Sequence, residues 1–398
     1  MPLTILHAAK LYPPMGGGME TVLRDLCDGT AGEWNVHVVA ANNCATTIRE
    51  RCGSVDVVRV ATYGKAASVP LCPALPLELW RRRADCVVLH EPNPIAGMAL
   101  FLRTPAPRLV VWHHSDLVRP SWAPATYGRV QRALYQRAEC VIVSSPALAA
   151  GSALVGHARR VVVIPFGIEL GRYTQVDEES RSRTNRQLAA VAGPRMLFVG
   201  RLVYYKGLEV LLDAMSRCGG SLVIVGEGPL EGALRSLVAG KGLGERVLFA
   251  GRVADSDLPA FYQACDLFVL PSIARTEAFG VVQIEAMAAG RPVVSTNLPT
   301  GVPWVNQDGV SGLVVPPGDA AALGDALRRL LEDAALRQRL GEGALRRAQT
   351  MFSRERMVAT FKSVIDTVVR EPELLDKGGE TSAANGRRTV SLPLSSDA

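Results

Sequence analysis

Short apolar runs alternate with amphipathic stretches along most of this chain. This alternation is typical of parallel sheets covered by helices. In the first half, the pattern predicts strands at 3–8, 36–41, 86–90, 109–113, 140–144 and 161–164. In the second half, it predicts strands at 196–200, 222–225, 247–250, 267–270, 292–295 and 312–315. The predicted fold class is therefore α/β, with two doubly wound, Rossmann-like domains in tandem.

Polar stretches predict the domain boundaries. Residues 171–192 contain VDEESRSRTNRQ and are helix-poor in pattern, so they are predicted to be a linker. The linker separates an N-terminal domain at 1–170 from a C-terminal domain at 193–352. Residues 353–370 are predicted to form a helix. The tail at 371–398 is polar and poor in aromatic residues, and it is predicted to be disordered.

Composition narrows the class of protein. The chain has 398 residues, of which 48% are hydrophobic, enough for two cores. Its net charge of +6 is too weak and too dispersed to indicate a nucleic-acid partner, but it suits anionic substrates or an anionic membrane surface. The eight cysteines lack C-x-x-C or Cys/His spacing, which indicates buried thiols in a reducing compartment.

The N-terminus, MPLTILHAAKLYPP, lacks the charged region and long apolar core of a signal peptide. No apolar run reaches the roughly 18 residues that a spanning helix needs. The sequence therefore predicts a cytoplasmic protein, either soluble or peripherally attached to a membrane.

The most informative segment is TEAFGVVQIEAMAAG at 276–290, which places Glu277 and Glu285 in an otherwise uncharged run. A buried carboxylate needs a partner such as a hydroxyl group or a cation. A predicted helix start just after Glu277 would offer free N–H groups to an anionic, hydroxyl-rich ligand. Eight residues of helix span about 12 Å, too far for an acid–base pair, which needs roughly 5–9.5 Å. We expect two contacts along one extended ligand; two structural glutamates in a core helix are the alternative.

Two loops after predicted strands add candidates. Gly16 and Gly17, in LYPPMGGGMETVLRDL, permit close backbone approach before a helix start, although a plain tight turn is the alternative. Their spacing is not the G-x-G-x-x-G of dinucleotide sites. Arg201 and Lys206, in GRLVYYKG, supply two cations that suit a diphosphate leaving group. A solvated surface pair is the alternative.

Asp255 and Asp257 have the D-x-D spacing of a metal–diphosphate ligand pair. They precede the predicted helix LPAFYQAC, where acidic residues commonly act as N-caps. We therefore interpret them as caps and predict no metal site.

The E-x7-E pattern resembles the signature of family 4 retaining glycosyltransferases. GRLVYYKG (200–207), VIVGEGP (223–229), LFVLPS (267–272) and GVSGLVVPPGD (309–319) resemble that family in the same order. The resemblance covers residues 5–369. It implies the GT-B architecture, a ligand site between the two domains, and a C-terminal helix that crosses back to the first domain. It also implies no cofactor and no divalent metal.

The same resemblance implies roles for individual residues. Glu277, His114 in VVWHHSDLVRP, Arg201 and Lys206 would carry catalysis. Glu277 and His114 would hold the donor sugar, Glu285 the ribose, and the two cations the diphosphate. Glu91 and Asn93, in HEPNPIAG, are candidate acceptor contacts. The implied donor-binding residues are Gly16, Gly17, Arg201, Lys206, Arg252, Val253, Glu277, Ala278, Phe279, Gly280 and Glu285.

The stretches YPPMGGGMET, HSDLVRP and STNLPTGVPWVNQDGVSG resemble bacterial enzymes of polysaccharide and O-antigen assembly. The resemblance implies transfer of mannose from the nucleotide sugar GDP-mannose to a polyprenyl-diphosphate-linked oligosaccharide. A UDP-hexose donor is the alternative. A nicotinamide-dependent oxidoreductase would need the missing dinucleotide fingerprint, and a solute-binding protein would need a secretion signal.

Two runs of the first domain combine aromatic rings with arginines. LPLELWRRRADC (75–86) contains Trp80 beside three arginines, and SWAPATYGRVQRALYQR (121–137) contains Trp122, Tyr127 and Tyr135. Such combinations suit lipid headgroups, so we expect peripheral attachment to the cytoplasmic face of the inner membrane. An ordinary solvated helix face is the alternative.

Overall fold

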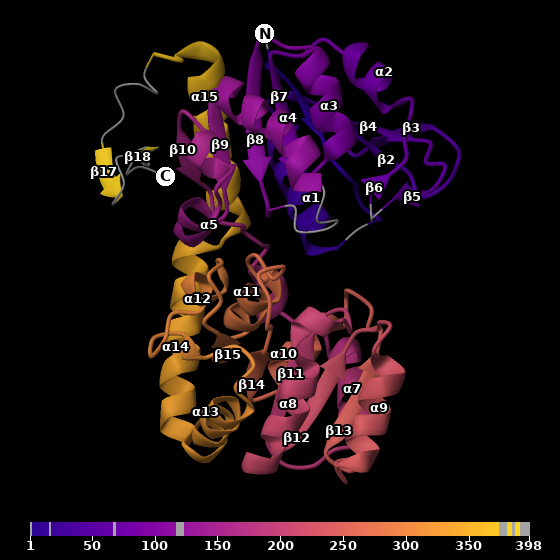
Figure 1. Cartoon of the computed structure of the whole chain (residues 1–398). Helices are drawn as coiled ribbons and strands as arrows, with labels where there is room; N and C mark the ends of the chain where they lie inside the picture. The colour runs from indigo at the N-terminus through magenta and orange to yellow at the C-terminus, as the bar shows by residue number, and fades with distance from the viewer. Residues whose placement is uncertain are drawn as a thin grey trace. The chain divides into compact units, whose positions relative to one another are not determined.

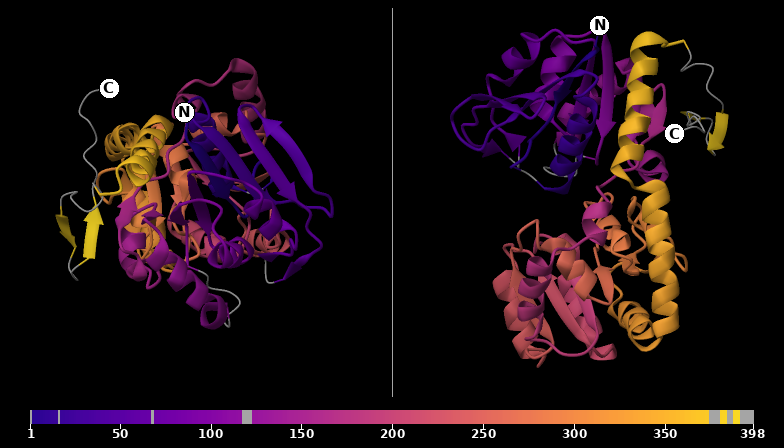
Figure 2. Two further views of the ribbon diagram at one scale, coloured as in Figure 1. Left: turned by 90° about the horizontal axis from the view of Figure 1, so that it is seen from above. Right: turned by 180° about the vertical axis from the view of Figure 1, so that it is seen from behind.

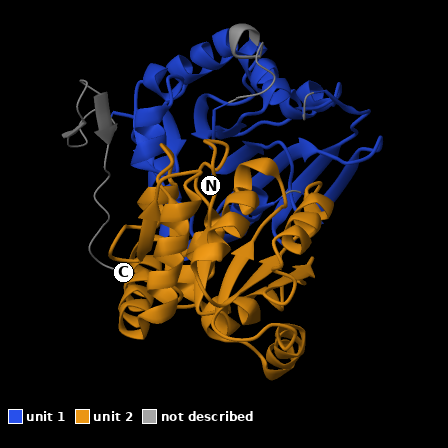
Figure 3. Ribbon diagram, turned by 60° about the horizontal axis from the view of Figure 1, so that its bottom comes forward, with its two compact units in different colours: residues 1–167, 354–398 blue, residues 168–353 orange. Residues whose placement is uncertain are grey.

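The computed structural model describes residues 2–15, 17–66, 69–116, 123–373, 380–383 and 387–390. The chain divides into two compact units (Figures 1 and 3). Unit 1 comprises residues 1–167 and 354–398, and unit 2 comprises residues 168–353. Among the described helices, none combines the length and the apolar character needed to span a bilayer.

The main sheet of unit 1 has the strand order β17-β18-β10-β9-β8-β7-β1-β2-β4-β3. Neighbouring strands are parallel, except that β3 and β17 are antiparallel to their partners. A separate hairpin contains β5 and β6. The strands are β1 (Thr4–Ala8), β2 (Asn35–Ala41), β3 (Ile48–Cys52), β4 (Val55–Val60), β5 (Lys65–Ala66), β6 (Val69–Pro70), β7 (Cys86–Glu91), β8 (Arg108–His113), β9 (Cys140–Val143), β10 (Val161–Val163), β17 (Glu380–Ala383) and β18 (Arg387–Val390).

Helices cover both faces of this sheet. On one face, α2, α3 and α4 pack on apolar strand residues such as Leu89 and Val111. On the other face, Phe361 of α15 contacts the rings of Trp34 and Trp112, and α15 lies beside α1 (Figure 2). The helices are α1 (Gly18–Thr30), α2 (Leu75–Trp80), α3 (Pro94–Leu102), α4 (Ala123–Arg137), α5 (Pro146–Gly151), the 3-10 turn η1 (Val155–His157) and α15 (Arg354–Arg370).

Unit 2 contains a six-stranded parallel sheet with the order β13-β12-β11-β14-β15-β16. The chain winds outward in one direction from β11 and in the other from β14. The loops after these two strands therefore meet at the switch point, where doubly wound sheets bind ligands. The strands are β11 (Arg195–Val199), β12 (Ser221–Val225), β13 (Val247–Gly251), β14 (Leu267–Leu270), β15 (Val293–Thr296) and β16 (Gly312–Val315).

The helices of unit 2 follow the strands and bury apolar faces on the sheet, with Phe198, Leu211 and Leu327 in one continuous core. They are α6 (Gly171–Thr174), α7 (Glu178–Leu188), η2 (Tyr204–Lys206), α8 (Leu208–Ala214), η3 (Met215–Arg217), α9 (Glu231–Gly240), α10 (Leu258–Ala264), α11 (Val281–Ala288), α12 (Val302–Val305), α13 (Ala320–Glu332) and α14 (Ala334–Met351).

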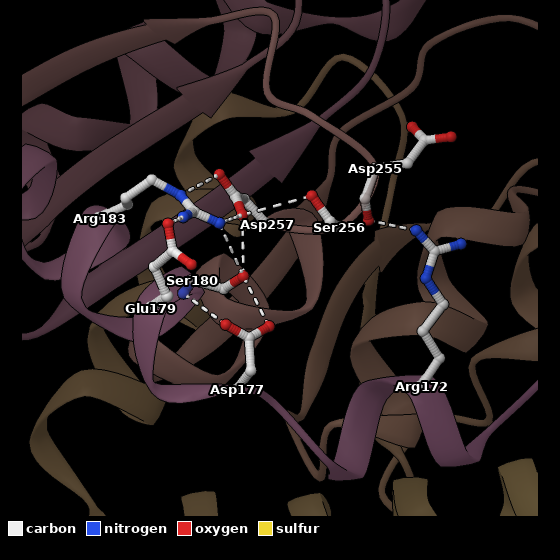
Figure 4. A network of polar contacts seen from close by, with 8 residues as sticks. All are labelled: Arg172, Asp177, Glu179, Ser180, Arg183, Asp255, Ser256 and Asp257. Atoms are coloured by element: carbon white, nitrogen blue, oxygen red, sulfur yellow. Dashed lines mark hydrogen bonds and ion pairs between the residues drawn. The ribbon is translucent and has the colours of Figure 1, made fainter.

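The segment predicted to be a linker is helical instead. Residues 171–174 form α6, residues 178–188 form α7, and both belong to unit 2. Asp177 caps α7 by accepting from the Ser180 N–H at 2.8 Å, and Arg183 pairs with Asp257 at 2.6 Å (Figure 4). The buried positions of α7 include small polar residues, Ser180 and Thr184. The helix therefore lacks the apolar stripe by which a helix is recognised in sequence.

The tail also differs from its prediction. Residues 380–383 and 387–390 form the strands β17 and β18, and β18 pairs with β10 at Val161 and Thr389. The prediction of disorder is wrong for these two strands, which a polar composition does not reveal. The other residues beyond 373 lie outside the described residues.

Gly97 of α3 faces a buried polar group. A Cβ atom there would lie 1.7 Å from the Tyr127 hydroxyl oxygen and 2.9 Å from Glu91 Oε1. Gly97→Ala is therefore expected to lower the free energy of unfolding by about 1–3 kcal/mol, the usual cost of overpacking. Thermal or denaturant unfolding measures this change.

Gly128→Ala is the matched control. Gly128 lies on α4, and a Cβ there would meet no atom within 4 Å. Because alanine is the better helix former, this variant should gain about 0.5–1 kcal/mol. A Gly97→Ala protein as stable as wild type would contradict the close packing.

Candidate functional site

Two loops bring opposite charges together at the switch point of unit 2. Lys206 lies on the loop after β11, and Glu277 lies on the loop after β14. Lys206 Nζ is 2.6 Å from Glu277 Oε2, and the Ser272 hydroxyl donates to the same oxygen at 3.1 Å. Lys206 and Glu277 are each only 8% exposed. The cation expected for this buried carboxylate thus comes from the neighbouring loop.

Glycines allow these loops to approach each other. Gly207 has φ 69°, and a Cβ there would lie 2.1 Å from the carbonyl oxygen of Pro271. A Cβ on Gly226, in the loop after β12, would lie 2.1 Å from the carbonyl oxygen of Gly200. Only glycine permits such backbone contact, so the glycines of GRLVYYKG and VIVGEGP have a definite packing role.

Arg201 extends the positive charge of this loop. Its side chain is exposed, and no ion pair to it occurs in the described part of the chain. Burial raises the pKa of the nearby Tyr205, whereas Lys206 and Arg201 oppose that rise. A lysine ammonium carries three donors, and one faces Glu277. The loop therefore has donors left for an anion.

Glu285 has a different kind of partner. Helix α11 begins at Val281, after Glu277, so only Glu285 lies on the helix itself. The Tyr262 hydroxyl donates to Glu285 Oε2 at 2.6 Å. Burial raises the pKa of Glu285, and the hydrogen bonds from Tyr262 and Tyr173 oppose this effect. One glutamate is thus paired with a cation and the other with phenols.

The segment between them is held from both sides. The Phe279 ring is buried against Trp304, and its carbonyl oxygen accepts from the Gln283 side chain at 3.0 Å. The carbonyl oxygen of Ala278 accepts from the backbone N–H of Gly301 at 2.8 Å. Gly280 caps α11 with φ 74°. The backbone beside Glu277 is therefore fixed before any ligand arrives.

Arg252 and Val253 follow β13 and line a cavity of about 480 Å³ together with α7 residues that include Arg183. Asp257, on the same cavity, accepts from Arg183 at 2.6 and 3.0 Å (Figure 4). Asp257 occupies the N-cap position of α10, but its side chain makes no capping bond. The prediction of a capping side chain is therefore wrong for Asp257: its carboxylate anchors α7.

In unit 1, the glycine loop is fixed by its neighbours. Gly17 caps α1, and its N–H donates to the Glu20 carboxylate at 2.7 Å. The buried Arg59 donates to the carbonyl oxygens of Tyr12 at 2.6 Å and Pro13 at 2.5 Å. Gly16 lies outside the described residues. The loop after β1 is thus tied to α1 and β4.

His114 follows β8 and is almost completely buried. Its Nε2 lies 3.0 Å from Nδ1 of His90, whose Nε2 lies 3.0 Å from Nδ1 of His7. His113 points elsewhere, with its Nδ1 2.7 Å from the Tyr135 hydroxyl. His7 and His90 were not predicted from the sequence. A histidine inside each of two apolar strands, TILHA and CVVLHE, was the available signal.

The side chains of Glu91 and Asn93 make hydrogen bonds inside unit 1. The Glu91 carboxylate accepts from the Tyr127 hydroxyl at 2.5 Å, the Gln131 amide at 3.0 Å and the Asn93 N–H at 3.0 Å. It is fully buried, and burial raises its pKa. Asn93 caps α3 by accepting from the Ala96 N–H at 3.3 Å. An acceptor contact through Glu91 is therefore contradicted, because the side chain is 0% exposed and its hydrogen bonds are internal.

The aromatic rings expected at a membrane also have internal roles. Trp80 Nε1 donates to the carbonyl oxygens of Ala99 at 3.1 Å and Arg103 at 3.0 Å. The hydroxyls of Tyr127 and Tyr135 are bonded within unit 1, and Trp122 lies outside the described residues. The interpretation of Trp80, Tyr127 and Tyr135 as headgroup contacts is wrong, since these rings hold elements of unit 1 together.

Two family models match the chain. The Glycosyl transferase 4-like domain matches residues 17–167, and Glycosyl transferases group 1 matches residues 181–347. Together they span most of both units.

Several known proteins are similar over most of their length. O-antigen chain mannosyltransferase C from Escherichia coli is 33% identical over 92% of this chain and 99% of that protein. D-rhamnosyltransferase WbpZ from Pseudomonas aeruginosa is 31% identical over 88% of this chain and 92% of that protein. The GDP-mannose-dependent alpha-(1-6)-phosphatidylinositol monomannoside mannosyltransferase from Mycobacterium tuberculosis is 28% identical over 83% of this chain and 89% of that protein.

Among solved structures, sucrose-phosphate synthase from Thermosynechococcus elongatus superposes with a TM-score of 0.76 at 24% identity, over 92% of this chain and 98% of that chain. This likeness shows the fold, while the family models and the full-length relatives show the family. The chain, with its two Rossmann-like units, therefore belongs to the family 4-like, group 1 glycosyltransferases of the GT-B fold.

Proposed function

We propose that the protein transfers mannose from GDP-mannose to a polyprenyl-diphosphate-linked oligosaccharide, with retention of the anomeric configuration, in O-antigen or exopolysaccharide assembly. The strongest support is the similarity, over nearly the whole of both chains, to an O-antigen chain mannosyltransferase. A GDP-mannose-dependent relative supports the choice of base. A UDP-hexose is the competing donor.

The Lys206–Glu277 pair suggests how the site would work. The bond between the sugar C1 and the diphosphate oxygen breaks, so negative charge builds up on the diphosphate. Lys206 and Arg201 would stabilise that charge, because both cations are already in place before the reaction begins. Glu277 would accept hydrogen bonds from sugar hydroxyls. The acceptor oxygen bonds to C1 on the same face, and its proton passes to the leaving diphosphate.

The other donor contacts complete this proposal. Glu285 would accept from the ribose hydroxyls, as it accepts from the Tyr262 hydroxyl in this structure. Backbone groups near Arg252 and Val253 would contact the base. His114 would hydrogen-bond the sugar. We propose that no metal ion is needed, because Lys206 and Arg201 would supply the positive charge that a metal ion would otherwise bring to the diphosphate.

Lys206→Ala and Arg201→Ala are each expected to lower turnover by about a hundredfold or more, because each removes a preorganised partner of the developing charge. A donor-hydrolysis or transfer assay with GDP-mannose measures the loss. Lys241→Ala is the control, since Lys241 lies on the surface of the same unit and pairs with Asp213 at 2.7 Å.

Near-wild-type rates for both Lys206→Ala and Arg201→Ala would refute the diphosphate assignment. The same assay in EDTA tests the metal proposal, and the rate should not change. A loss that magnesium restores would show instead that a metal ion takes part.

Glu277→Gln and Glu285→Ala are expected to differ in kind. Glu277→Gln should lower transfer strongly while GDP binding is kept, because its contacts are to the sugar. Glu285→Ala should weaken GDP binding by about tenfold, the loss of one or two hydrogen bonds. Calorimetry with GDP and UDP measures both effects, and wild type should bind GDP more tightly.

Tyr262→Phe separates the two explanations for Glu285. It removes the hydroxyl that donates a hydrogen bond to Glu285, but it leaves the Glu285 carboxylate intact. If Tyr262→Phe weakened GDP binding as much as Glu285→Ala, the loss would come from the disturbed internal bond. Tighter binding of UDP than of GDP would favour the UDP-hexose donor.

We further propose that unit 1 attaches to an anionic membrane, where a lipid-linked acceptor would lie. Four apolar side chains, which we call the α3 surface, are 42–67% exposed: Leu77, Met98, Phe101 and Leu102. Helix α3 lies between α2 and α4 (Figure 1). Exposed arginines flank it, with Arg81 and Arg83 after α2 and Arg129 and Arg132 on α4. Apolar side chains ringed by arginines suit the headgroup region of an anionic bilayer.

The double variant Met98→Asp, Leu102→Asp should bind vesicles containing phosphatidylglycerol at least about tenfold more weakly than wild type, because each buried apolar side chain contributes about 1.5–3 kcal/mol. Flotation at low salt measures the bound fraction. Val310→Asp is the control, since Val310 of unit 2 is as exposed as Met98, at 43% each. Equal flotation of variant and wild type, or none of either, would contradict the membrane proposal.

A further inference from the structure

Three buried histidines form a continuous hydrogen-bonded chain in unit 1. His7 lies on β1, His90 on β7 and His114 directly after β8. The two links, from His7 Nδ1 to His90 Nε2 and from His90 Nδ1 to His114 Nε2, are each 3.0 Å. The chain therefore crosses three neighbouring strands of the sheet.

Aromatic rings enclose this chain. The Phe361 ring of α15 lies 5.9 Å from the His7 ring, and the Trp112 ring lies 5.8 Å from the rings of both His90 and His114. His7 Nε2 and His114 Nδ1 are the two ends, and neither has a hydrogen-bond partner among the described residues. His7 is fully buried, whereas His114 is 8% exposed. Both end nitrogens are therefore buried, and only the His114 residue has any exposed surface.

All three rings are uncharged near neutral pH. Burial lowers the pKa of His7 and of His114 to about 3, and it lowers the pKa of His90 well below its usual value. A neutral imidazole has one N–H donor and one bare acceptor nitrogen. Each ring in the chain therefore contributes a single proton.

This constraint fixes the three tautomers together. If His114 carries its proton on Nδ1, its Nε2 is an acceptor, so His90 must donate from Nδ1. His90 Nε2 is then an acceptor in turn, and His7 must donate from Nδ1. The opposite choice at His114 places every proton on Nε2. Any mixture would bring two protons or two lone pairs face to face at 3.0 Å.

We propose that His7 and His90 are positioning residues that fix, through a shared tautomer, whether His114 Nδ1 acts as donor or acceptor toward a sugar hydroxyl. His114 cannot change that role alone, because a proton would have to shift at every ring. A preset donor or acceptor needs no reorganisation when a ligand binds. The sugar contact itself rests on the proposed function, but the shared tautomer does not.

The tautomers can be read directly in the ligand-free protein. The protein has six histidines in all. Long-range ¹H–¹⁵N correlation spectra of histidine-labelled protein are therefore simple enough to assign by substitution. His7, His90 and His114 are expected to show one and the same neutral tautomer. Different tautomers among the three, or a charged ring at pH 7, would overturn the proposal whatever the donor is.

The functional role is tested with two variants of His90, which is one bond removed from His114. His90→Phe has neither donor nor acceptor, and it should lower kcat/KM for GDP-mannose by about tenfold, as expected for one disturbed hydrogen bond. His90→Gln keeps one donor and one acceptor and should recover to within about threefold of wild type. GDP affinity should be unchanged in both.

His37→Phe is the matched control, because His37 lies on β2 of the same sheet but is not one of the three hydrogen-bonded histidines. Equal loss in His90→Phe and His90→Gln would mean that ring packing, not hydrogen bonding, matters. Wild-type kcat/KM in His90→Phe would remove the positioning role. If neither the wild type nor any variant uses GDP-mannose, the donor proposal fails. The spectra still show whether the three histidines share one tautomer.

Discussion

A hydrogen-bonded ion pair between two loops, Lys206 with Glu277, is the interaction on which the site of unit 2 depends. Both side chains are nearly buried, so either one alone would carry a large desolvation penalty. The pair exists only because the loops after β11 and β14 touch, and that contact exists only because glycines stand at the crossing points. The fixed segment from Ala278 to Gly280 then gives Glu277 a defined place. Charge, glycine placement and sheet topology therefore form one constraint.

Buried or partly buried carboxylates recur in this molecule, and each has a different partner. Glu277 has an ammonium, Glu285 has phenol hydroxyls, and Glu91 has a phenol, an amide and a backbone N–H. Exposure separates these carboxylates. Glu91 is 0% exposed and acts as an internal brace between α3 and α4. Glu277 and Glu285 both retain some exposed surface.

The apolar pattern was sufficient to predict the two sheets. Each of the twelve expected strands occurs to within one residue at either end, because strands buried on both faces are apolar throughout. The hairpin of β3 and β4 was missed, since the IRERC residues of β3 are largely exposed and carry no apolar alternation. Helix α7 was missed because its buried face includes small polar residues.

For the candidate site, motif resemblance predicted roles for Lys206 and Glu277, but it could not show that they contact each other. Ser272, Tyr262, His7 and His90 were not predicted, because a side chain that acts through a neighbour has no spacing rule of its own. The same limit led to the wrong roles for Trp80 and Glu91. Their residue types suit a surface or an acceptor, and only the three-dimensional packing shows that their polar atoms are already bonded.

The position of α15 also affects how the chain can fold as it is synthesised. This helix covers one face of the sheet of unit 1, where Phe361 contacts Trp34 and Trp112, yet it lies at the far end of the sequence. Unit 2 is continuous in sequence and can close its core from 168–353 alone. Unit 1 cannot cover its sheet until residue 370 has left the ribosome. The usual order, in which the N-terminal domain is completed first, is therefore reversed here, and the nascent sheet needs protection from aggregation until then.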